Sequence, residues 1–182
     1  MRNWVYKSLS DEALMKKYSK GSTCAFDYLY LRNKDALFLF LNRQCNNRSV
    51  AEELAHDTWI AVINRAENYQ SNAKFKTWLF RIAHNRLVDY WRKYGTSSQQ
   101  ILDEISNQLL VNSEPSINQL ELEDIFKSLE VLSVDQMEVL LLKIEGFSHF
   151  EISKITNAKQ ETVKSRLRYA VKHLRTVMEA TS

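Results

Sequence analysis

The chain has 182 residues, of which 45% are hydrophobic and 26% charged, and its formal net charge is +3. This is globular composition, and the length allows one domain or two small ones. Three glycines and one proline are too few for the many turns of a sheet protein, so we expect an all-α fold. The sequence has no apolar run of about 18 residues and no signal-peptide core, and its two cysteines have no metal or redox spacing. These features predict a cytoplasmic protein without a membrane span.

The N-terminal half of the sequence predicts a small helical domain, because its rare breakers and N-cap residues fall between apolar-periodic stretches. Ser10 precedes a stretch with acids in its first turn, and Gly21 follows that stretch. Ser49 begins an S-x-x-E capping box, and Gly95 ends a long basic and aromatic segment. We expect helices at roughly 10–20, 22–32, 34–46, 50–66 and 75–94.

The predicted helix 50–66 has an outward face that mixes acidic and apolar side chains, namely Glu53, Asp57 and Ile60. Such a face is typical of a surface that docks on another protein. An ordinary solvated helix face gives the same pattern, so periodicity alone leaves both interpretations open. The side that we expect to be buried consists of Ala51, Leu54, Ala55, Thr58, Val62 and Ala66.

The predicted helix 75–94 interleaves aromatic and basic residues. A helical wheel places Arg81, Asn85 and Arg92 on one side, with Trp78 beside them. A cationic face bordered by an indole suits single-stranded DNA, whose bases stack on aromatic rings. Taken singly, Trp78 and Trp91 are as readily interpreted as core residues. The apolar stripe that we expect to face the core consists of Phe75, Leu79, Ile82, Ala83 and Tyr90.

Residues 96–120 predict a flexible acidic linker. The stretch 96–124 contains six acids and no Lys or Arg, and it opens with a polar run of low helix propensity. Basic residues concentrate on either side of it, seven in 74–93 when a histidine is counted as charged and six in 159–175. Two basic patches joined by an acidic tether indicate a polyanion bound at two places, unless each patch is only a solvated helix face.

The C-terminal part, 121–182, predicts a second helical domain with a helix-turn-helix. Capping boxes begin at Ser133 and Ser148, and two short helices separated by about three residues follow Gly146. The second helix has an apolar stripe of Val163, Leu167, Ala170, Val171 and Leu174. Its remaining side chains are placed to read base edges or to hold phosphates of duplex DNA. These candidates are Glu161, Thr162, Lys164, Ser165, Arg166, Arg168 and Tyr169.

Three stretches together resemble the extracytoplasmic-function (ECF) group of bacterial RNA polymerase sigma factors. They are 51–59 (AEELAHDTW), 75–85 (FKTWLFRIAHN) and 162–167 (TVKSRL), in the order that the family has, and the likeness runs from about residue 10 to 176. The resemblance implies two helical domains, 1–95 and 121–182, joined by the linker 96–120. It also implies that the protein directs core polymerase to specific promoters and helps to open the minus-ten region.

The resemblance assigns roles that periodicity does not. Glu53, Asp57 and Ile60 would dock on the clamp of the polymerase's largest subunit, and the linker would enter the RNA exit path. The helix-turn-helix would read the minus-thirty-five element as duplex. The loop 68–74 and the helix after it would capture and melt the minus-ten element through Asn72, Lys74, Lys76, Trp78, Arg81, Asn85 and Arg92. An anti-sigma factor is a further partner that the resemblance implies.

The sequence departs from the family in the turn of the helix-turn-helix. Asn157 and Ala158 stand where the family often has glycine. Because asparagine tolerates the left-handed backbone conformation better than most residues, we expect the turn to be kept.

Two other classes of function are less consistent with the sequence. A conventional helix-turn-helix regulator with an N-terminal sensing domain has no need of the basic aromatic helix at 75–94, and such a protein normally dimerises on a two-fold site. An enzyme is disfavoured because the four histidines form no HExxH motif and no glycine-rich phosphate loop is present. We therefore expect no catalytic activity, no cofactor, no metal and no membrane association.

Overall fold

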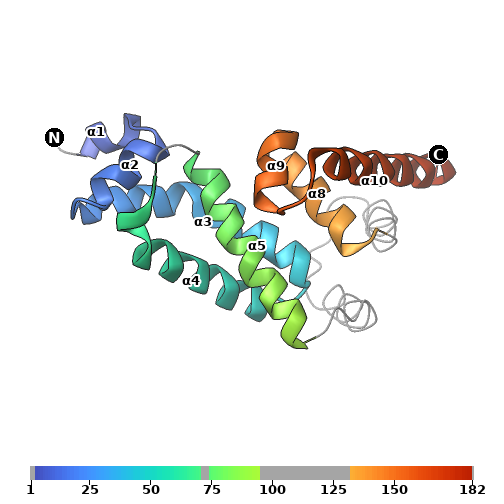
Figure 1. The fold of residues 1–182 in the computed structure, drawn as a ribbon, viewed down its shortest axis with the longest axis horizontal. Helices are drawn as coiled ribbons and strands as arrows, with labels where there is room; N and C mark the ends of the chain where they lie inside the picture. The colour runs from blue at the N-terminus through green and yellow to red at the C-terminus, as the bar shows by residue number, and fades with distance from the viewer. Residues whose placement is uncertain (1–2, 71–73, 95–131, 182) are drawn as a thin grey trace, which may run out of the picture. The chain divides into compact units, whose positions relative to one another are not determined.

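The computed structural model describes residues 3–70, 74–94 and 132–181. These residues form helices and contain no strand, which confirms the all-α prediction. They divide into an N-terminal unit, within 3–94, and a C-terminal unit, with helices between 134 and 181 (Figure 1). The predicted linker, 96–120, lies outside the described residues. No helix in the described ranges combines the length and apolarity needed to cross a membrane.

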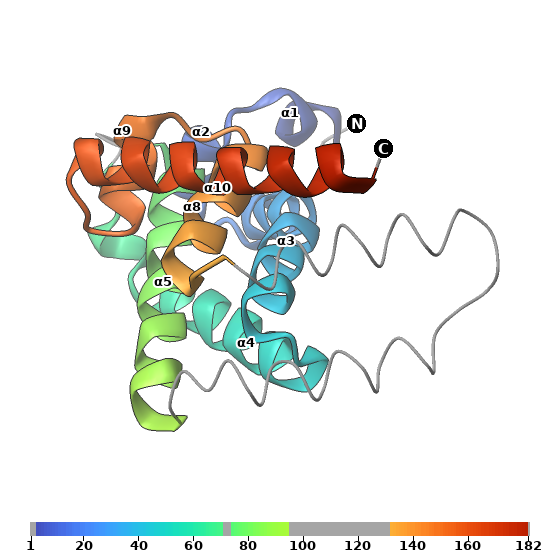
Figure 2. The same ribbon diagram turned by 90° about the vertical axis from the view of Figure 1, so that its right-hand side faces the viewer.

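Three long helices carry most of the N-terminal unit. They pack against one another in pairs, and Figures 1 and 2 show them side by side: α3 (Thr23–Cys45), α4 (Arg48–Asn64) and α5 (Phe75–Tyr94). Shorter elements complete the unit, namely α1 (Asn3–Ser8), α2 (Asp11–Tyr18) and the 3₁₀ helix η1 (Ala66–Asn68). Because α2 contacts both α3 and α5, it joins the start of the chain to the last helix of this unit.

Polar side chains at the N-caps explain where α2 and α4 begin. As predicted, Ser10 caps α2, and its Oγ accepts a hydrogen bond from the Ala13 amide at 3.3 Å. The predicted cap of α4, Ser49, is wrong. Asn47 caps this helix, and its Oδ1 accepts a hydrogen bond from the Val50 amide at 3.1 Å. Asparagine caps as well as serine, so the earlier residue is used and Ser49 falls inside the first turn.

The two helices predicted at 22–32 and 34–46 form a single helix, α3. The boundary expected at Asn33 is absent because this side chain is buried and its amide donates to the Leu29 carbonyl at 3.0 Å, within the same helix. The surrounding stretch has no glycine or proline to interrupt the backbone. α3 ends at Asn46, whose φ of 48° is the left-handed conformation common at helix C-termini.

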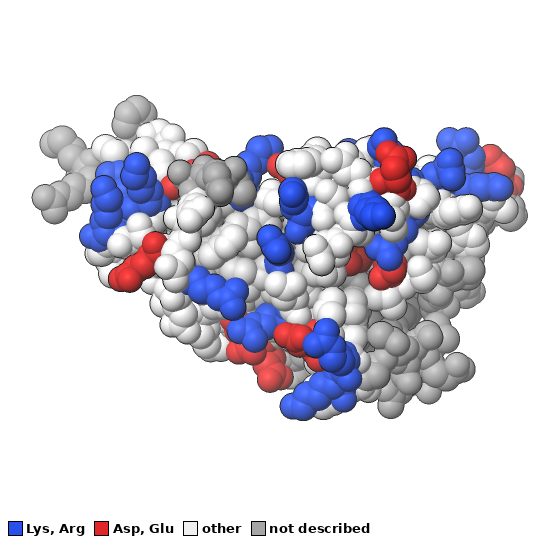
Figure 3. All heavy atoms as spheres, in the orientation of Figure 1, with Lys and Arg blue, Asp and Glu red and all other residues white. Residues whose placement is uncertain are grey.

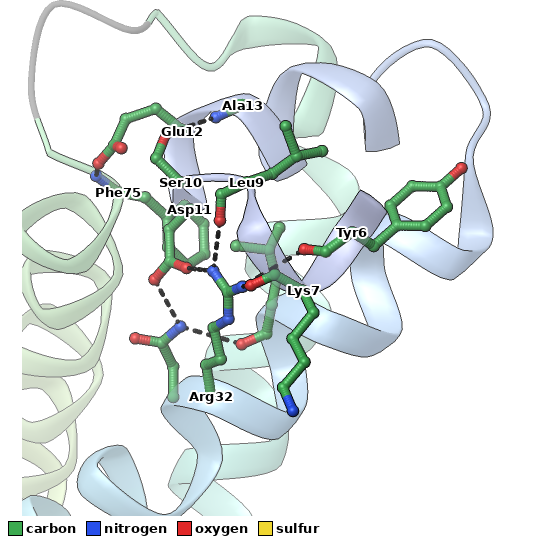
Figure 4. Close-up of polar contacts among 11 residues, drawn as sticks. Tyr6, Lys7, Leu9, Ser10, Asp11, Glu12, Ala13, Arg32 and Phe75 are labelled. Atoms are coloured by element: carbon green, nitrogen blue, oxygen red, sulfur yellow. Dashed lines mark hydrogen bonds and ion pairs between the residues drawn. The ribbon is translucent and has the colours of Figure 1, made fainter. Parts of the chain in front are cut away.

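A single arginine of α3 holds the start of the chain in place (Figure 4). The guanidinium of Arg32 donates to the carbonyls of Tyr6, Lys7 and Leu9 at 3.3, 2.6 and 2.7 Å and pairs with Asp11 at 2.9 Å. The carbonyls at a helix C-terminus lack partners within their own helix, and the guanidinium fork satisfies several at once. Because α1 is secured by a residue of α3, its local sequence pattern did not predict it.

Buried apolar side chains hold the N-terminal unit together. The rings of Phe40 and Phe80, 5.3 Å apart, join α3 to α5. Each large side chain that is fully buried contributes about 1.5–3 kcal/mol, so packing dominates over the polar clamps. Other members of this core are Leu14, Met15, Leu29, Leu37, Leu41, Phe75, Leu79 and Leu87.

The C-terminal unit is smaller. It consists of α8 (Val134–Ile144), α9 (His149–Ile155) and α10 (Gln160–Thr181), and α8 packs along α10. Its buried apolar side chains come from every one of these helices and from the turn after α8, and they include Leu142, Phe147, Ile152, Val163 and Ala170. The long helix α10 is therefore supported along its N-terminal half by the rest of the unit.

The two cysteines are expected to differ in reactivity. Cys24 is exposed, whereas Cys45 is buried, and burial raises the pKa of the Cys45 thiol to about 12. Since the thiolate is the reactive species, we expect an aromatic disulfide reagent at pH 8 to modify only Cys24 rapidly in the native protein. Cys24→Ser should remove the rapid phase, and Cys45 should react only on unfolding. A rapid phase that persists in Cys24→Ser would contradict this prediction.

Candidate promoter and polymerase interfaces

The helix-turn-helix begins with a sharp end to α8. Gly146 has a φ of 90°, and the amides of Gly146 and Phe147 donate to the carbonyls of Lys143 and Leu142 at 3.1 and 3.2 Å. This pair of bonds is the Schellman motif, in which glycine avoids the penalty that a Cβ pays at positive φ. The chain thereby leaves α8 sharply, and four residues, 145–148, separate it from α9.

Both capping boxes predicted in the C-terminal unit are confirmed. At α8, the Ser133 Oγ accepts from the Gln136 amide at 3.3 Å, and the Gln136 side chain accepts from the Ser133 amide at 3.1 Å. At α9, Ser148 and Glu151 make the same reciprocal pair at 3.2 and 2.8 Å. Each box satisfies two backbone amides that have no partner inside their helix.

The turn between α9 and α10 is kept without glycine. Asn157 adopts a φ of 52°, as expected for the residue that replaces glycine there. Four residues, 156–159, separate α9 from α10. The side chains predicted to read DNA lie in the first turns of α10.

The predicted apolar stripe of α10 is confirmed except at one position. Val163, Leu167 and Ala170 are buried and Leu174 is half-buried. Val171 is 47% exposed, so its assignment to the stripe was wrong. At 100° per residue Val171 lies about 70° from the centre of the stripe, beyond the width that α8 covers.

The opposite face of α10 brings the minus-thirty-five candidates together. Lys164, Arg168, Tyr169 and Glu161 are exposed, and Thr162, Ser165 and Arg166 are half-buried. The Arg168 guanidinium lies 5.6 Å from the centroid of the neighbouring Tyr169 ring. The ammonium of Lys164 pairs with Glu161 at 2.7 Å, and this hydrogen bond and charge lower the pKa of the Glu161 carboxyl. The face therefore carries cations and hydroxyls, and the acid that it contains, Glu161, is paired with Lys164.

Arg166 has a structural partner that the sequence did not predict. Its Nη2 forms an ion pair with the Asp135 carboxylate in the first turn of α8. The side chain of Arg166 is 27% exposed, so this pair braces α10 against α8 at the edge of the reading face. An arginine held in this way is placed differently from Arg168, although the two are only two residues apart.

The minus-ten candidates of α5 lie on its solvent side. Arg81, Asn85 and Arg92 are exposed, and Arg92 pairs with Asp89 one turn earlier at 3.3 Å. Figure 3 shows Lys and Arg side chains gathered at the C-terminal end of α5. The predicted core stripe is buried at Phe75, Leu79, Ile82 and Ala83 and half-buried at Tyr90.

The candidates at the start of α5 are described in part. Lys74 is exposed, and the ammonium of Lys76 lies 5.6 Å from the Phe80 ring centroid. Asn72 lies in 71–73, outside the described residues. In the ranges that are described, no three His, Cys, Asp or Glu side chains lie together as a metal site would require.

Trp78 is half-buried in a cluster of three aromatic rings at the start of α5. Its ring centroid lies 5.1 Å from that of Tyr69 and 6.0 Å from that of Phe75. Burial, together with the nearby charges of Glu12 and Asp11, raises the pKa of Tyr69 to about 12. The indole of Trp78 is therefore packed against two other rings while the residue keeps partial access to solvent, and its role in binding DNA stays a prediction.

The outward face of α4 matches the prediction. Glu53 and Ile60 are exposed, Asp57 is half-exposed, and the neighbouring Ile63 is 43% exposed. On its opposite side α4 packs Trp59 against the rings of α3. The predicted buried residues are buried at Ala51, Leu54, Thr58, Val62 and Ala66 and half-buried at Ala55.

Comparison with known proteins supports the interpretation of both units. Two sequence families match the chain: Sigma-70 region 2 over residues 29–96 and Sigma-70, region 4 over residues 122–174. The ECF RNA polymerase sigma factor SigX of Bacillus subtilis is 28% identical over 162 residues, which are 85% of this chain and 84% of SigX. The ECF RNA polymerase sigma-E factor of Escherichia coli K12 is 25% identical, over 88% of this chain and 90% of that protein.

Solved structures share the fold. The sigma factor RpoE in complex with the anti-sigma factor NepR, from Bartonella quintana, matches with a TM-score of 0.66 and 28% identity, covering 85% of this chain and 96% of that one. CnrH in complex with the cytosolic domain of CnrY matches with a TM-score of 0.70 and 22% identity, covering 94% and 99%.

One helical unit carries a helix-turn-helix and the other a basic aromatic helix. Together with the family matches, this arrangement defines a transcription initiation factor. The chain belongs to the sigma-70 family, as a member of its ECF group. The protein is an RNA polymerase sigma factor, and its partners are core RNA polymerase and promoter DNA. A conventional regulator with an N-terminal sensing domain is not favoured, because region 2 occupies that place.

Proposed function

We propose that the exposed face of α10 reads the minus-thirty-five element in the major groove of duplex DNA. The observation that supports this most directly is the division of α10 into a buried stripe and an opposite polar face, within its first three turns. A recognition helix presents base-reading side chains from its N-terminal turns and holds phosphates with flanking cations. The proposed contacts are Glu161, Thr162, Lys164, Ser165, Arg166, Arg168 and Tyr169.

The second proposed surface is the solvent side of α5 with the loop before it, for the minus-ten element. The cations of this face suit the backbone of an unpaired strand, and the accessible part of Trp78 suits stacking with a base. The proposed contacts are Asn72, Lys74, Lys76, Trp78, Arg81, Asn85 and Arg92. On this proposal each helical unit holds one promoter element, and residues 96–120 connect them.

The third proposed surface is the outward face of α4, for the clamp of the polymerase. Glu53, Asp57 and Ile60 combine exposed charge with exposed apolar surface on one helix side. Reversing a charge in such an interface lowers affinity strongly, because the new charge is desolvated next to charges of the same sign on the partner. Asp57→Lys is therefore expected to weaken core polymerase binding by about 100-fold.

The Asp57→Lys prediction is tested by titrating core polymerase with labelled protein. The matched control is Asp35→Lys, which makes the same charge change at a side chain of α3 that is 79% exposed. Unchanged core binding by Asp57→Lys would remove this residue from the interface, and equal loss in both variants would indicate a non-specific charge effect.

Mapping of transcription starts tests the proposed function as a whole. Core bacterial RNA polymerase transcribes fragmented genomic DNA with and without the purified protein, and the RNA 5′ ends are sequenced. We expect new starts that share two upstream motifs, one near minus thirty-five and one near minus ten. If new starts share only one motif, one of the two DNA surfaces is assigned wrongly.

We also propose that the protein works in the cytoplasm, has no catalytic chemistry of its own and is held inactive by an anti-sigma factor. The solved structure of RpoE with NepR supports the last point, since that relative has the same fold and is bound by such a protein. The promoter-specific transcription above should then fall when a cognate anti-sigma factor is added and return when it is removed.

A further inference from the structure

A carboxylate from α2 lies at the first residue of α5. The Glu12 Oε1 accepts a hydrogen bond from the Phe75 amide at 2.9 Å, across 63 residues of chain (Figure 4). The Phe75 amide is one of the first N–H groups of the helix, which have no partner within it. A neighbouring residue usually supplies the cap, but Lys74 precedes α5 and its ammonium is a donor with no acceptor. α5 therefore takes its cap from another helix.

The electrostatics favour the ionised form of this cap. Burial alone would raise the pKa of Glu12, but the hydrogen bonds from the Phe75 and Glu12 amides and from Ser10, with the charge of Lys74, lower it below its usual value. A negative charge at a helix N-terminus is also favoured by the helix dipole. The carboxylate is thus an acceptor at neutral pH, and its charge interacts with that of Lys74, a residue of the proposed minus-ten surface.

The same carboxylate also acts on Tyr69, which precedes the segment 70–74. Its charge is one of the causes, after burial, that raise the pKa of Tyr69. Tyr69 stands just before the segment 70–74 and Phe75 just after it, and their rings are 6.1 Å apart. Glu12 is therefore close to both residues that flank the loop.

The position of Glu12 is fixed by the polar contacts of its neighbours in and before α2. Ser10 caps α2 just before it, and the neighbouring Asp11 is held by Arg32 at 2.9 Å and by the Asn33 amide at 3.0 Å. These contacts tie α2 to the middle of α3, which lies in the core of the unit. The cap on α5 is consequently positioned by the contacts between α2 and α3.

We propose that Glu12 is a positioning residue for the minus-ten surface: it caps α5 from α2 and so fixes the direction of the first turn of α5. The proposal rests on the proposed role of α5 in opening DNA. In that role α5 makes the contact to DNA, and Glu12 acts on it through the Phe75 amide. Loss of the acceptor should free the first turn of α5 and impair capture of the unpaired strand.

The test compares Glu12→Ala with Glu12→Gln in holoenzyme formed with core polymerase, on a promoter found by start mapping. Glutamine keeps a side-chain carbonyl that can accept from the Phe75 amide, whereas alanine keeps none. Permanganate reactivity of minus-ten thymines measures opening, and labelled-protein titration measures core binding. We expect Glu12→Ala to lower the open fraction about fivefold, Glu12→Gln to stay within about twofold of the original chain, and core binding to be unchanged in both.

The matched control is Asn47→Ala, which removes the N-cap of α4 in the same unit. It should cost similar thermal stability and leave opening intact. Three outcomes would overturn the proposal: opening by Glu12→Ala equal to that of the original chain, Glu12→Gln as impaired as Glu12→Ala, or equal loss of opening in Asn47→Ala. Absence of reactive thymines with the original chain would instead reject the proposed role of α5, so the two failures are distinguishable.

Discussion

Arg168→Ala is expected to lower the affinity of the holoenzyme for a promoter with a minus-thirty-five element about tenfold, with no change in the free energy of unfolding. Arg168 is exposed on α10, and its guanidinium lies over the Tyr169 ring 5.6 Å away, which leaves its donors available to DNA. A bidentate contact of arginine with guanine contributes about 1–3 kcal/mol, and a tenfold change lies in this range. Binding to promoter fragments with and without a scrambled minus-thirty-five element measures the effect.

The Arg168 prediction distinguishes base reading from phosphate binding. If Arg168 reads a base, the variant should lose the preference for the intact element. If it holds a phosphate, affinity should fall equally on both fragments and the salt dependence should become shallower. Unchanged affinity on both fragments would contradict any contact of Arg168 with DNA.

Arg166 supplies an informative contrast, because its ion pair with Asp135 gives it a role in the absence of DNA. A partly exposed pair of this kind contributes about 0.5–1 kcal/mol to stability. Arg166→Ala should therefore lose stability as well as DNA affinity. Asp135→Ala should lose a similar amount of stability and keep or gain DNA affinity, since it removes an acid beside the reading face and leaves the arginine in place.

The C-terminal unit was largely predictable because its signals are local. Ser133, Ser148 and Gly146 each act on residues within a turn of themselves, through capping boxes and a Schellman motif. The same holds for Asn157, where one backbone conformation decides the turn. The position of Val171 was missed because a helical wheel gives directions, while the width of the buried stripe depends on the helix that packs against it.

The N-terminal unit shows where local patterns stop being informative. The place of α1 depends on Arg32, and the start of α5 depends on Glu12. Each of these contacts joins residues more than 20 positions apart, and nothing in a single sequence ties their ends together. Spacing and charge could predict which faces of α5 and α10 are exposed and polar, whereas the residues that hold those helices in position could not be predicted.

Trp78→Ala is expected to lower both the stability of the N-terminal unit and the opening of DNA, because the indole packs on two rings while remaining accessible. Removing it takes away the contacts with Tyr69 and Phe75, whose centroids lie 5.1 and 6.0 Å away. Truncation of a half-buried aromatic side chain should lower the free energy of unfolding by about 2 kcal/mol. On the proposed function, the loss of a stacking surface should also reduce opening of the minus-ten region about tenfold.

Arg81→Ala separates the two consequences of the Trp78 change. Arg81 is exposed on the same helix, so its truncation should leave the free energy of unfolding within about 0.5 kcal/mol of the original while impairing opening. Denaturant unfolding and permanganate reactivity are measured on both variants, with closed-complex formation as the reference. If Trp78→Ala loses stability but opens DNA normally once folded and bound to core polymerase, Trp78 belongs to the core and the stacking role fails. If Arg81→Ala is impaired in opening and Trp78→Ala is impaired more than its stability accounts for, the strand is held by charge and by stacking on one face of α5.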